Sequence, residues 1–353
     1  MEHHYILTKK IEKNENNAMK KRKLDEIIFT RACSCIGIAI YHYFCHSKGN
    51  FKFLYNTANA SFGFIFVTVF FNISGATLYY NYPLIKSIKT FYFKRWKSIF
   101  PSFYFCYLYF FISISLRFRR LLFGRKIKRL FITLLGLDGY LSYRIRTCYL
   151  IGEWFLGAII IIYVIYPIFS LIVTKNYFIS AIIICILNIF IYYGNFFIII
   201  NDKNIITCLT SFYFGVTAIK FKKIFLVNNI SLAISFFLFI FLRIIKIKSL
   251  EIVFQMQGFT AFIILTRIGK IVMTNKCARI FICISNLSYN IYLIHHMIII
   301  DILSINNPLE WYSNLLFLSI TLLLIIICSK IVSILVNSIL NSIIFKKMES
   351  FFI

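Results

Sequence analysis

Acidic residues are scarce in this chain. Only 12 of its 353 residues are Asp or Glu, and charged residues of both signs make up 14%. A soluble domain carries about a quarter charged residues and is nearer half apolar. Here 60% of the residues are hydrophobic, which gives more apolar surface than one soluble core of this size can bury. The shortage of charge therefore excludes an ordinary soluble globular protein and requires lipid as part of the solvent.

Stretches rich in proline or glycine are also missing, because the chain contains only 4 Pro and 13 Gly. We find no long linker, no internal repeat and no second, soluble domain. We divide the chain into a basic cytoplasmic tail over 1–26, a transmembrane domain over 27–345 and a short C-terminal tail over 346–353.

Cysteine patterns typical of metal sites or disulfide frameworks are absent. Among the ten cysteines, Cys33 and Cys35 are closely spaced, but no second pair follows at zinc-like spacing. Most of the others lie in apolar stretches, where thiols usually act as small packing residues. We therefore expect neither a metal site nor a bound cofactor.

Positive charge is abundant but dispersed. The net charge is +27, and the basic residues fall in short clusters between apolar stretches rather than in one patch. Such clusters are typical of cytoplasmic loops that face anionic lipid, so we expect membrane lipid and no nucleic acid as a partner. The cluster Lys20–Lys23 precedes the first apolar run and predicts a cytoplasmic N-terminus. That run lacks a small-residue cleavage site, which indicates an uncleaved first helix in the cell (inner) membrane.

Hydrophobic runs long enough to cross a bilayer recur along the whole chain. A membrane-spanning helix needs about 20 mostly apolar residues, and the sequence predicts an all-α, polytopic membrane protein with about ten such helices. The predicted spans are 27–46, 61–80, 99–116, 152–173, 177–194, 205–219, 224–242, 251–266, 280–302 and 313–335.

One basic segment disagrees with this topology. The run from Arg117 to Arg129 is rich in Arg and Lys, yet alternation of the spans places it outside. Either the charge rule fails for this longer connection, or a half-span around Leu130 to Leu141 changes the geometry.

Arg31 and His42 are eleven positions apart in the first predicted helix. Eleven residues make about three helical turns, so both side chains point the same way, about 16 Å apart along the axis. A cation near the inner face can bind phosphates, and a histidine deeper in the membrane can accept a proton. The alternative is an ordinary interfacial anchor at Arg31 and an interhelical hydrogen bond at His42.

With ten residues between them, Arg31 and His42 resemble the signature of the membrane-bound acyltransferase family 3, which contains polysaccharide O-acetyltransferases. Four further stretches agree in the family's order, and together they cover most of the chain. They are FFNISG at 70–75, which resembles FF-x-x-SG; KRWKSIFP at 94–101, a basic run ending in I-x-P; EWFL at 153–156 with Tyr163 and Pro167, which resembles a WFL…Y…P helix; and LSYNIYLIH at 287–295, which resembles SY-x-x-YL-x-H.

This resemblance implies transfer of an acyl group, with acetyl as the expected one, from acetyl-CoA as co-substrate to a hydroxyl of a glycan or a lipid-linked sugar. It implies His42 and Arg31 as catalytic residues, with His42 as the general base and Arg31 holding the phosphates of CoA, and Lys94, Arg95 and Lys97 as donor-binding residues. The other site candidates that it implies are Ser74, Glu153, Trp154, Tyr163, Ser288, Tyr289 and His295.

The chain also departs from the family pattern. Ser98 stands where the family commonly has Arg, which weakens the expectation of phosphate contacts there. Ile159 stands where many members carry Glu, and Glu153 either replaces that carboxylate or caps the helix.

Simpler interpretations remain open at several motifs. Ser74 and Gly75 are typical of a close helix crossing. The basic run is also typical of interfacial anchors. His295 and His296 are also typical of residues that form interhelical hydrogen bonds. The competing function is a carrier or flippase that moves a glycan or lipid precursor without acyl chemistry. A polymerising glycosyltransferase would need large outer loops, which we do not find.

Overall fold

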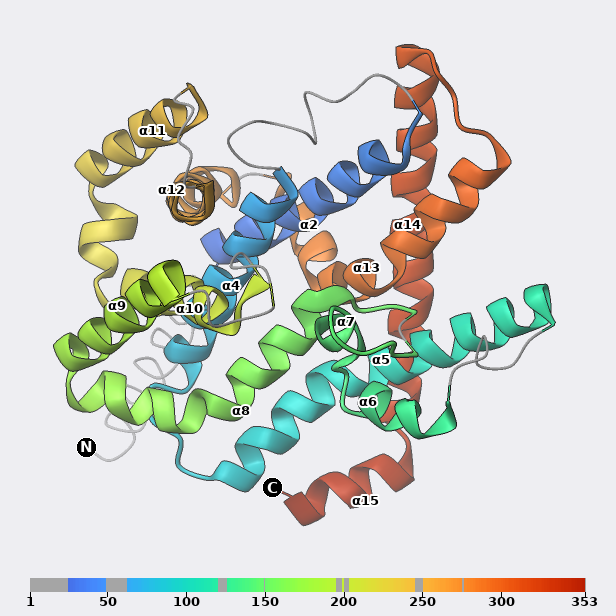
Figure 1. Ribbon diagram of the computed structural model, residues 1–353, viewed down its shortest axis with the longest axis horizontal. Helices are drawn as coiled ribbons and strands as arrows, with labels where there is room; N and C mark the ends of the chain where they lie inside the picture. The colour runs from blue at the N-terminus through green and yellow to red at the C-terminus, as the bar shows by residue number, and fades with distance from the viewer. Residues whose placement is uncertain are drawn as a thin grey trace, which may run out of the picture.

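The computed structural model describes residues 25–48, 62–119, 126–148, 150–194, 199, 203–244, 250–274 and 276–352. Helices and turns make up this part of the chain, and no β-strand occurs in it (Figure 1). The cluster Lys20–Lys23, on which the predicted orientation depends, lies outside the described residues.

Ten helices of the described residues follow the ten predicted spans in order. Seven of the helices in the described ranges are long and apolar enough to cross a membrane, and α9, α10 and α11 are shorter apolar helices. The chain is therefore a polytopic helical membrane protein, as predicted. The ten helices are α2 (Asp25–His46), α4 (Phe62–Asn81), α5 (Ile88–Phe118), α8 (Glu153–Lys175), α9 (Tyr177–Gly194), α10 (Ile205–Lys220), α11 (Asn229–Ile244), α12 (Leu250–Val272), α13 (Ala278–Ile305) and α14 (Trp311–Leu340).

Helix α5 begins at Ile88 rather than at the predicted residue 99, so it includes the whole basic run. The side chain of Ser87 caps this earlier start by accepting a hydrogen bond from the backbone N–H of Thr90 at 3.3 Å. Lys and Arg are good helix formers, so the helix continues beyond its apolar segment. A hydrophobicity pattern locates the part of a helix that can lie in lipid, and it misses a polar extension of this kind.

Short helices occupy the segment where the sequence left a half-span open. They are η2 (Ile127–Arg129), α6 (Leu130–Leu134) and α7 (Asp138–Leu141). Gly136 breaks the segment with a φ of +69°, a conformation that favours glycine. Helix α7 packs against α8, because Gly139 allows close approach to the backbone of Glu153. The segment therefore covers the beginning of α8.

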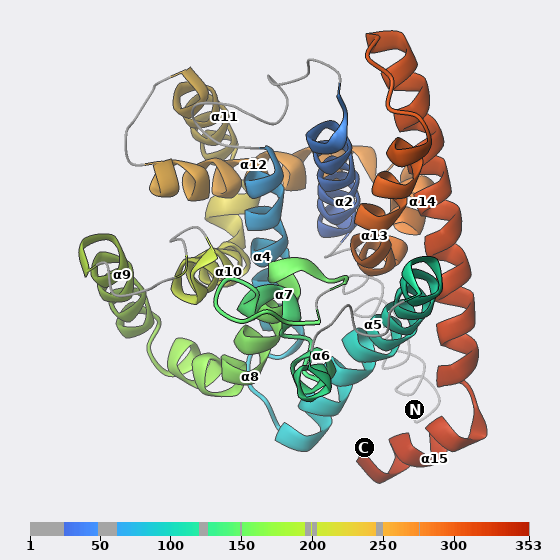
Figure 2. The same ribbon diagram turned by 45° about the vertical axis from the view of Figure 1, so that its right-hand side comes forward.

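Helix α2 lies at the centre of the bundle, in contact with α4, α12 and α13 (Figure 2). The π-helical turn η4 (Lys223–Val227) connects α10 to α11. Because α2 packs against α4, α12 and α13, its polar residues are held away from lipid. This is the arrangement expected for polar groups inside a membrane, where exposure to lipid is costly.

The crossing of α4 and α10 depends on one glycine from each helix. A Cβ added at Gly75 would overlap the backbone carbonyl of Phe212, and one added at Gly215 would overlap the carbonyl of Asn72. The close-crossing interpretation of Gly75 is therefore realised, since small residues let the backbones of membrane helices approach.

Replacing Gly75 with valine is expected to lower stability by about 1–3 kcal/mol, the usual cost of overpacking a well-packed contact. The backbone of Phe212 has to move, because the added atoms meet main chain rather than a flexible side chain. A thermal unfolding curve of the detergent-solubilised protein measures the loss. Ile168→Val, at a side chain that is 66% exposed, serves as the control and should leave the curve unchanged.

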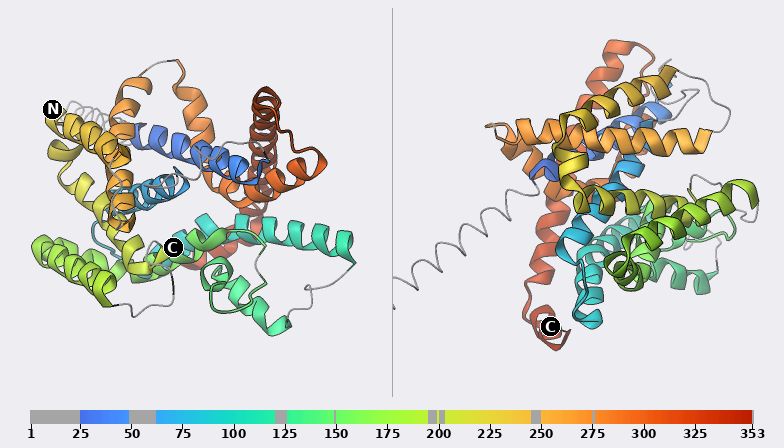
Figure 3. Two further views of the ribbon diagram at one scale, coloured as in Figure 1. Left: turned by 45° about the horizontal axis from the view of Figure 1, so that its top comes forward. Right: turned by 90° about the vertical axis from the view of Figure 1, so that its left-hand side faces the viewer.

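The C-terminal residues form the short helix α15 (Ile343–Phe352), which packs against the beginning of α5 (Figure 3). The rings of Phe93 and Phe352 are stacked with their centroids 4.8 Å apart. Lys97 donates a hydrogen bond to Glu349 at 2.6 Å. This ion pair occupies a side chain that the sequence assigned to donor binding.

Candidate active site

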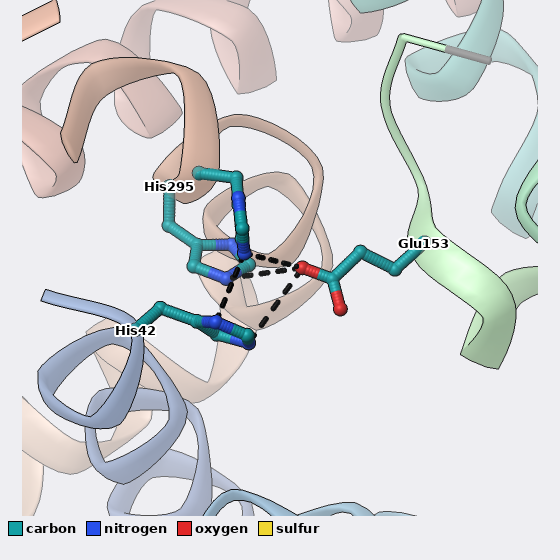
Figure 4. A group of neighbouring side chains, drawn as sticks. His42, Glu153 and His295 are labelled. Atoms are coloured by element: carbon teal, nitrogen blue, oxygen red, sulfur yellow. Dashed lines mark hydrogen bonds and ion pairs between the residues drawn. The ribbon is translucent and has the colours of Figure 1, made fainter. Parts of the chain in front are cut away.

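Three histidines and one carboxylate converge where α2, α8 and α13 meet (Figure 4). His42 comes from α2, Glu153 from the first residue of α8, and His295 and His296 from α13. The Oε1 atom of Glu153 lies 3.0 Å from Nε2 of His296, 3.6 Å from Nε2 of His42 and 3.9 Å from Nε2 of His295. His42 and His296 also approach each other, with 2.9 Å between Nδ1 and Nε2. We call these four residues the His–Glu cluster.

The tautomer of His295 follows from its surroundings. Its Nδ1 lies 3.1 Å from the carbonyl oxygen of Ile291 and 2.8 Å from that of Tyr292. A carbonyl only accepts hydrogen bonds, so Nδ1 carries the proton and Nε2 presents a lone pair. The side chain is 1% exposed. The lone pair therefore points into the cluster in a place that excludes bulk water.

Glu153 owes its position to the way α8 begins. Gly152 has a φ of +89° and Glu153 itself a φ of +31°, a conformation uncommon for a residue with a side chain. The hydroxyl of Tyr292 holds this turn, since it donates to the carbonyl of Gly152 and accepts from the N–H of Leu156 at 3.1 Å. A residue of α13 thus fixes the first turn of α8 and directs the carboxylate toward the two histidines of α13.

Tyr292→Phe is expected to keep the fold and to reduce the activity of the site about 10–100-fold, because the first turn of α8 loses the group that fixes Glu153. A hydrogen bond that is lost in this way is worth about 1 kcal/mol, and a small displacement of a reacting group can cost about 10²-fold in rate. The turnover number of the purified variant measures the effect. Tyr289→Phe is unsuitable as a control because Tyr289 lines a cavity of the site. Tyr312→Phe, at an exposed ring, should keep full activity.

A narrow cavity of about 270 Å³ runs between α2, α4, α5, α8 and α13. Arg31 and His42 both line it, as the helical spacing predicts. Arg95 lines it too, with its guanidinium 5.7 Å from the ring of Tyr163 and with a buried Nε that has no hydrogen-bond partner. Neither arginine forms an ion pair with a carboxylate within the part of the chain that the structure describes. Glu153 is the one carboxylate among the residues that line the cavity with these two arginines, so the lining keeps a net positive charge.

A wider cavity of about 660 Å³ lies on the other side of the cluster. Aromatic side chains form much of its wall, among them Tyr41, Tyr140, Tyr143 and Trp154. Lys203 also lines it, with Nζ 5.8 Å from the centre of the Trp154 ring. His42 and Glu153 line both cavities. The cluster therefore lies at the junction of two spaces of different character.

A family model described as an acyltransferase domain, Acyl_transf_3, matches residues 24–334. The match spans every element that contributes to the two cavities. The chain belongs to acyltransferase family 3. Comparison with curated proteins and with solved structures gave no significant match. Family membership supports acyltransferase activity in a membrane protein.

Most of the residues that the sequence singled out lie together in this acyltransferase. Trp154 lies in the wider cavity, and His295 belongs to the cluster. The narrow cavity is lined by Arg31, His42, Ser74, Arg95, Glu153, Tyr163, Ser288 and Tyr289.

Two predicted donor-binding residues lie elsewhere. Lys94 is exposed, and Lys97 pairs with Glu349 of α15. Successive residues of a helix point in directions about 100° apart, so only one or two members of a four-residue basic run can face the same cavity. In this acyltransferase Arg95 has that direction.

Several residues of the site were not among the sequence-predicted candidates, among them His296, Lys203 and Tyr292. The adjacent histidines at 295 and 296 and the tyrosine within the SY-x-x-YL-x-H stretch were visible signals. Nothing in the sequence indicates that Lys203, between two apolar runs, lies next to Trp154. Its role depends on how α8 and α10 pack.

Proposed function

We propose that this family 3 member is an O-acyltransferase that moves an acyl group, with acetyl as the favoured case, from acyl-CoA to a hydroxyl of a glycan or lipid-linked sugar. One observation supports this function above all. His42 lies at the junction of a positively charged cavity and a wide aromatic cavity. A membrane enzyme whose donor and acceptor arrive from opposite sides needs such a junction.

The narrow cavity suits the donor. CoA carries phosphates at one end and a thioester at the end of a long, thin pantetheine arm. Arg31 and Arg95 offer guanidinium groups, which bind phosphate through paired hydrogen bonds. In the proposed orientation, with the N-terminus in the cytoplasm, these arginines face the side where acyl-CoA is made. The arm then reaches through the cavity and brings the thioester to His42.

The wider cavity suits the acceptor. Aromatic rings bind the apolar faces of sugar rings, while hydroxyl groups at the cavity wall hydrogen-bond to the sugar edges. Trp154, Tyr140 and Tyr143 supply such rings, and Ser142 supplies a further hydroxyl. A volume of about 660 Å³ accommodates one or two sugar residues of a longer chain.

The reaction needs a base, because a sugar hydroxyl is a poor nucleophile at neutral pH. His42 takes the proton of the sugar hydroxyl while the hydroxyl oxygen attacks the carbonyl carbon of the thioester. The carbon–sulfur bond then breaks, and the CoA thiolate takes the proton from His42. The products are the sugar ester and free CoA, and His42 returns to its neutral form. Glu153, 3.6 Å from Nε2 of His42, stabilises the imidazolium in between.

Transfer of radiolabelled acetyl from acetyl-CoA into glycan, in membranes that contain the protein, tests this function directly. We expect label in the glycan fraction. Mild alkali should release this label from the glycan, since alkali hydrolyses an ester. Mass analysis of surface glycan with and without the gene should show a shift of one acetyl group for each modified unit.

The same experiment tests the competing carrier or flippase. A carrier moves the glycan and leaves its mass unchanged. If the glycan of membranes that contain the protein carries no label and has an unchanged mass, the O-acyltransferase proposal is contradicted.

A further inference from the structure

The His–Glu cluster contains an unusual excess of hydrogen-bond acceptors. Oε1 of Glu153 and Nε2 of His295 are both buried and without a hydrogen-bond partner within the described part of the chain, and they lie 3.9 Å apart. Buried polar atoms in native proteins are almost always satisfied, and an exception points to a catalytic role or to a water or ion. Two lone pairs directed at each other repel, so a proton, a water molecule or a metal cation has to lie between them. The convergence of four candidate ligand atoms within 4.8 Å of one another favours the metal.

We propose that Glu153, His295 and His296 bind one divalent transition-metal ion, of which zinc fits best, at the junction of the two cavities. This proposal deepens the function proposed above and rests on it for the role of the metal. Two imidazoles and one carboxylate are a donor set of catalytic zinc sites, which use three protein ligands and keep a fourth position open.

The distances fit a preformed site. Zinc bonds to imidazole nitrogen and carboxylate oxygen are about 2.0–2.2 Å long, so tetrahedral ligand atoms lie about 3.3–3.5 Å apart. Here Glu153 lies 3.0 Å from His296 and 3.9 Å from His295, measured between the ligating atoms. All the candidate ligand atoms of the cluster lie within 4.8 Å of one another. The two Glu153 distances differ from the tetrahedral values by less than about half an ångström.

The second ring nitrogen of His295 supports the same assignment. Metal-binding histidines almost always donate their other N–H to a carbonyl or carboxylate, which fixes the tautomer and the ring orientation. Nδ1 of His295 meets the carbonyl oxygens of Ile291 and Tyr292. Tyr292 also fixes the turn that carries Glu153. Two of the three ligands are therefore held in position by the same residue of α13.

Lys203 is the neighbouring cation, and it does not replace the metal. It lies over the face of Trp154 in the wider cavity and is not within ion-pair distance of Glu153 among the contacts of the described residues. The Oε1 atom of Glu153 faces the histidines instead (Figure 4).

His42 has a different place in this site. It lines both cavities, while His295 is almost completely buried. We assign His42 as the base beside the open coordination position rather than as a ligand. The metal would act as a Lewis acid on the oxygen that it binds, and His42 would handle the proton. No local pattern predicts this site, because its ligands lie on two helices, α8 and α13, that are far apart in the chain.

The test measures metal binding itself. The full-length protein, purified in detergent and stripped with a chelator, is titrated with Zn²⁺ and, separately, with Co²⁺, whose visible absorption reports tetrahedral nitrogen and oxygen ligands. We expect one ion per chain in the wild type. His295→Ala and Glu153→Gln should weaken binding at least about 100-fold, since losing even a supporting partner of a ligand costs about 10–100-fold.

Two further histidine variants serve as matched controls. His46→Ala removes an exposed histidine whose ring centre lies 5.1 Å from that of His296, and it should bind the metal as the wild type does. His42→Ala should also keep the metal while it loses acyl transfer.

A single symmetric size-exclusion peak shows that the wild-type protein is well folded. If such protein binds neither Zn²⁺ nor Co²⁺, the metal site is overturned. This result would leave the proposed acyl transfer intact, because transfer is measured separately. Loss of metal in His42→Ala equal to that in His295→Ala would overturn the three-ligand assignment. A His295→Gln variant keeps the volume of the side chain and replaces His295→Ala if the latter does not fold.

Discussion

Acyl transfer falls by about 10²–10⁴-fold when His42 is replaced with alanine, if this residue is the general base of the reaction. The side chain lies at the junction of the narrow and the wider cavity, and no other histidine of α2 lines both. The loss should appear in the turnover number, while the Michaelis constants for both substrates change little, because the base acts on the transition state. Initial rates with purified protein and labelled acetyl-CoA measure it.

His46 offers a control within the same helix. It lies one turn further along α2 and is exposed, so His46→Ala should keep the wild-type turnover number. If His42→Ala protein inserts normally and still transfers acetyl at the wild-type rate, His42 has no part in the chemistry. A carrier without acyl chemistry would show no transfer in any variant, which separates the two functions.

Arg31→Ala is expected to raise the Michaelis constant for acyl-CoA about 10–150-fold. A hydrogen bond to a charged group contributes about 1.5–3 kcal/mol, and every 1.4 kcal/mol changes an equilibrium constant tenfold. Arg31 lines the narrow cavity and pairs with no carboxylate within the described ranges, so its guanidinium is available for a phosphate. The constant for the glycan acceptor should remain unchanged, because Arg31 does not line the wider cavity.

The basic run of α5 provides the comparison for this second prediction. Arg95→Ala should act in the same direction as Arg31→Ala, since Arg95 lines the same cavity. Lys94→Ala should have no effect on acyl-CoA binding, because Lys94 is exposed. An equal effect of Lys94→Ala would mean that the donor binds along the outer surface of α5, and an unchanged constant in Arg31→Ala would remove this residue from donor binding.

One physical reason explains why Arg95 lines the narrow cavity while Lys94 and Lys97 do not. The sequence shows that Lys94, Arg95 and Lys97 lie next to an apolar segment, but the direction of each side chain depends on where the helix begins and what it packs against. α15 binds Lys97 through Glu349, and this partner lies more than two hundred residues further along the chain. Contacts of that kind cannot be predicted from local pattern.

The role of Glu153 also depends on contacts that the local sequence pattern does not predict. The sequence left open whether it replaces the missing carboxylate at Ile159 or caps α8. The structure places its carboxylate against three histidines because Tyr292 fixes the turn before α8. Neither the positive φ of Glu153 nor the hydroxyl that holds it is visible in the spacing of residues.

The amino-acid sequence by itself determined the membrane-spanning helices and the shared direction of Arg31 and His42. Both are local properties, since the length of an apolar run and the periodicity of a helix depend only on residues close together in the chain. Tertiary structure alone decided which distant residues meet: Glu153 with His295 and His296, and Arg95 rather than Lys97 with the other residues of the narrow cavity. These contacts arise from the packing of α2, α5, α8 and α13, because the angle and rotation of each helix are set by all of its neighbours together.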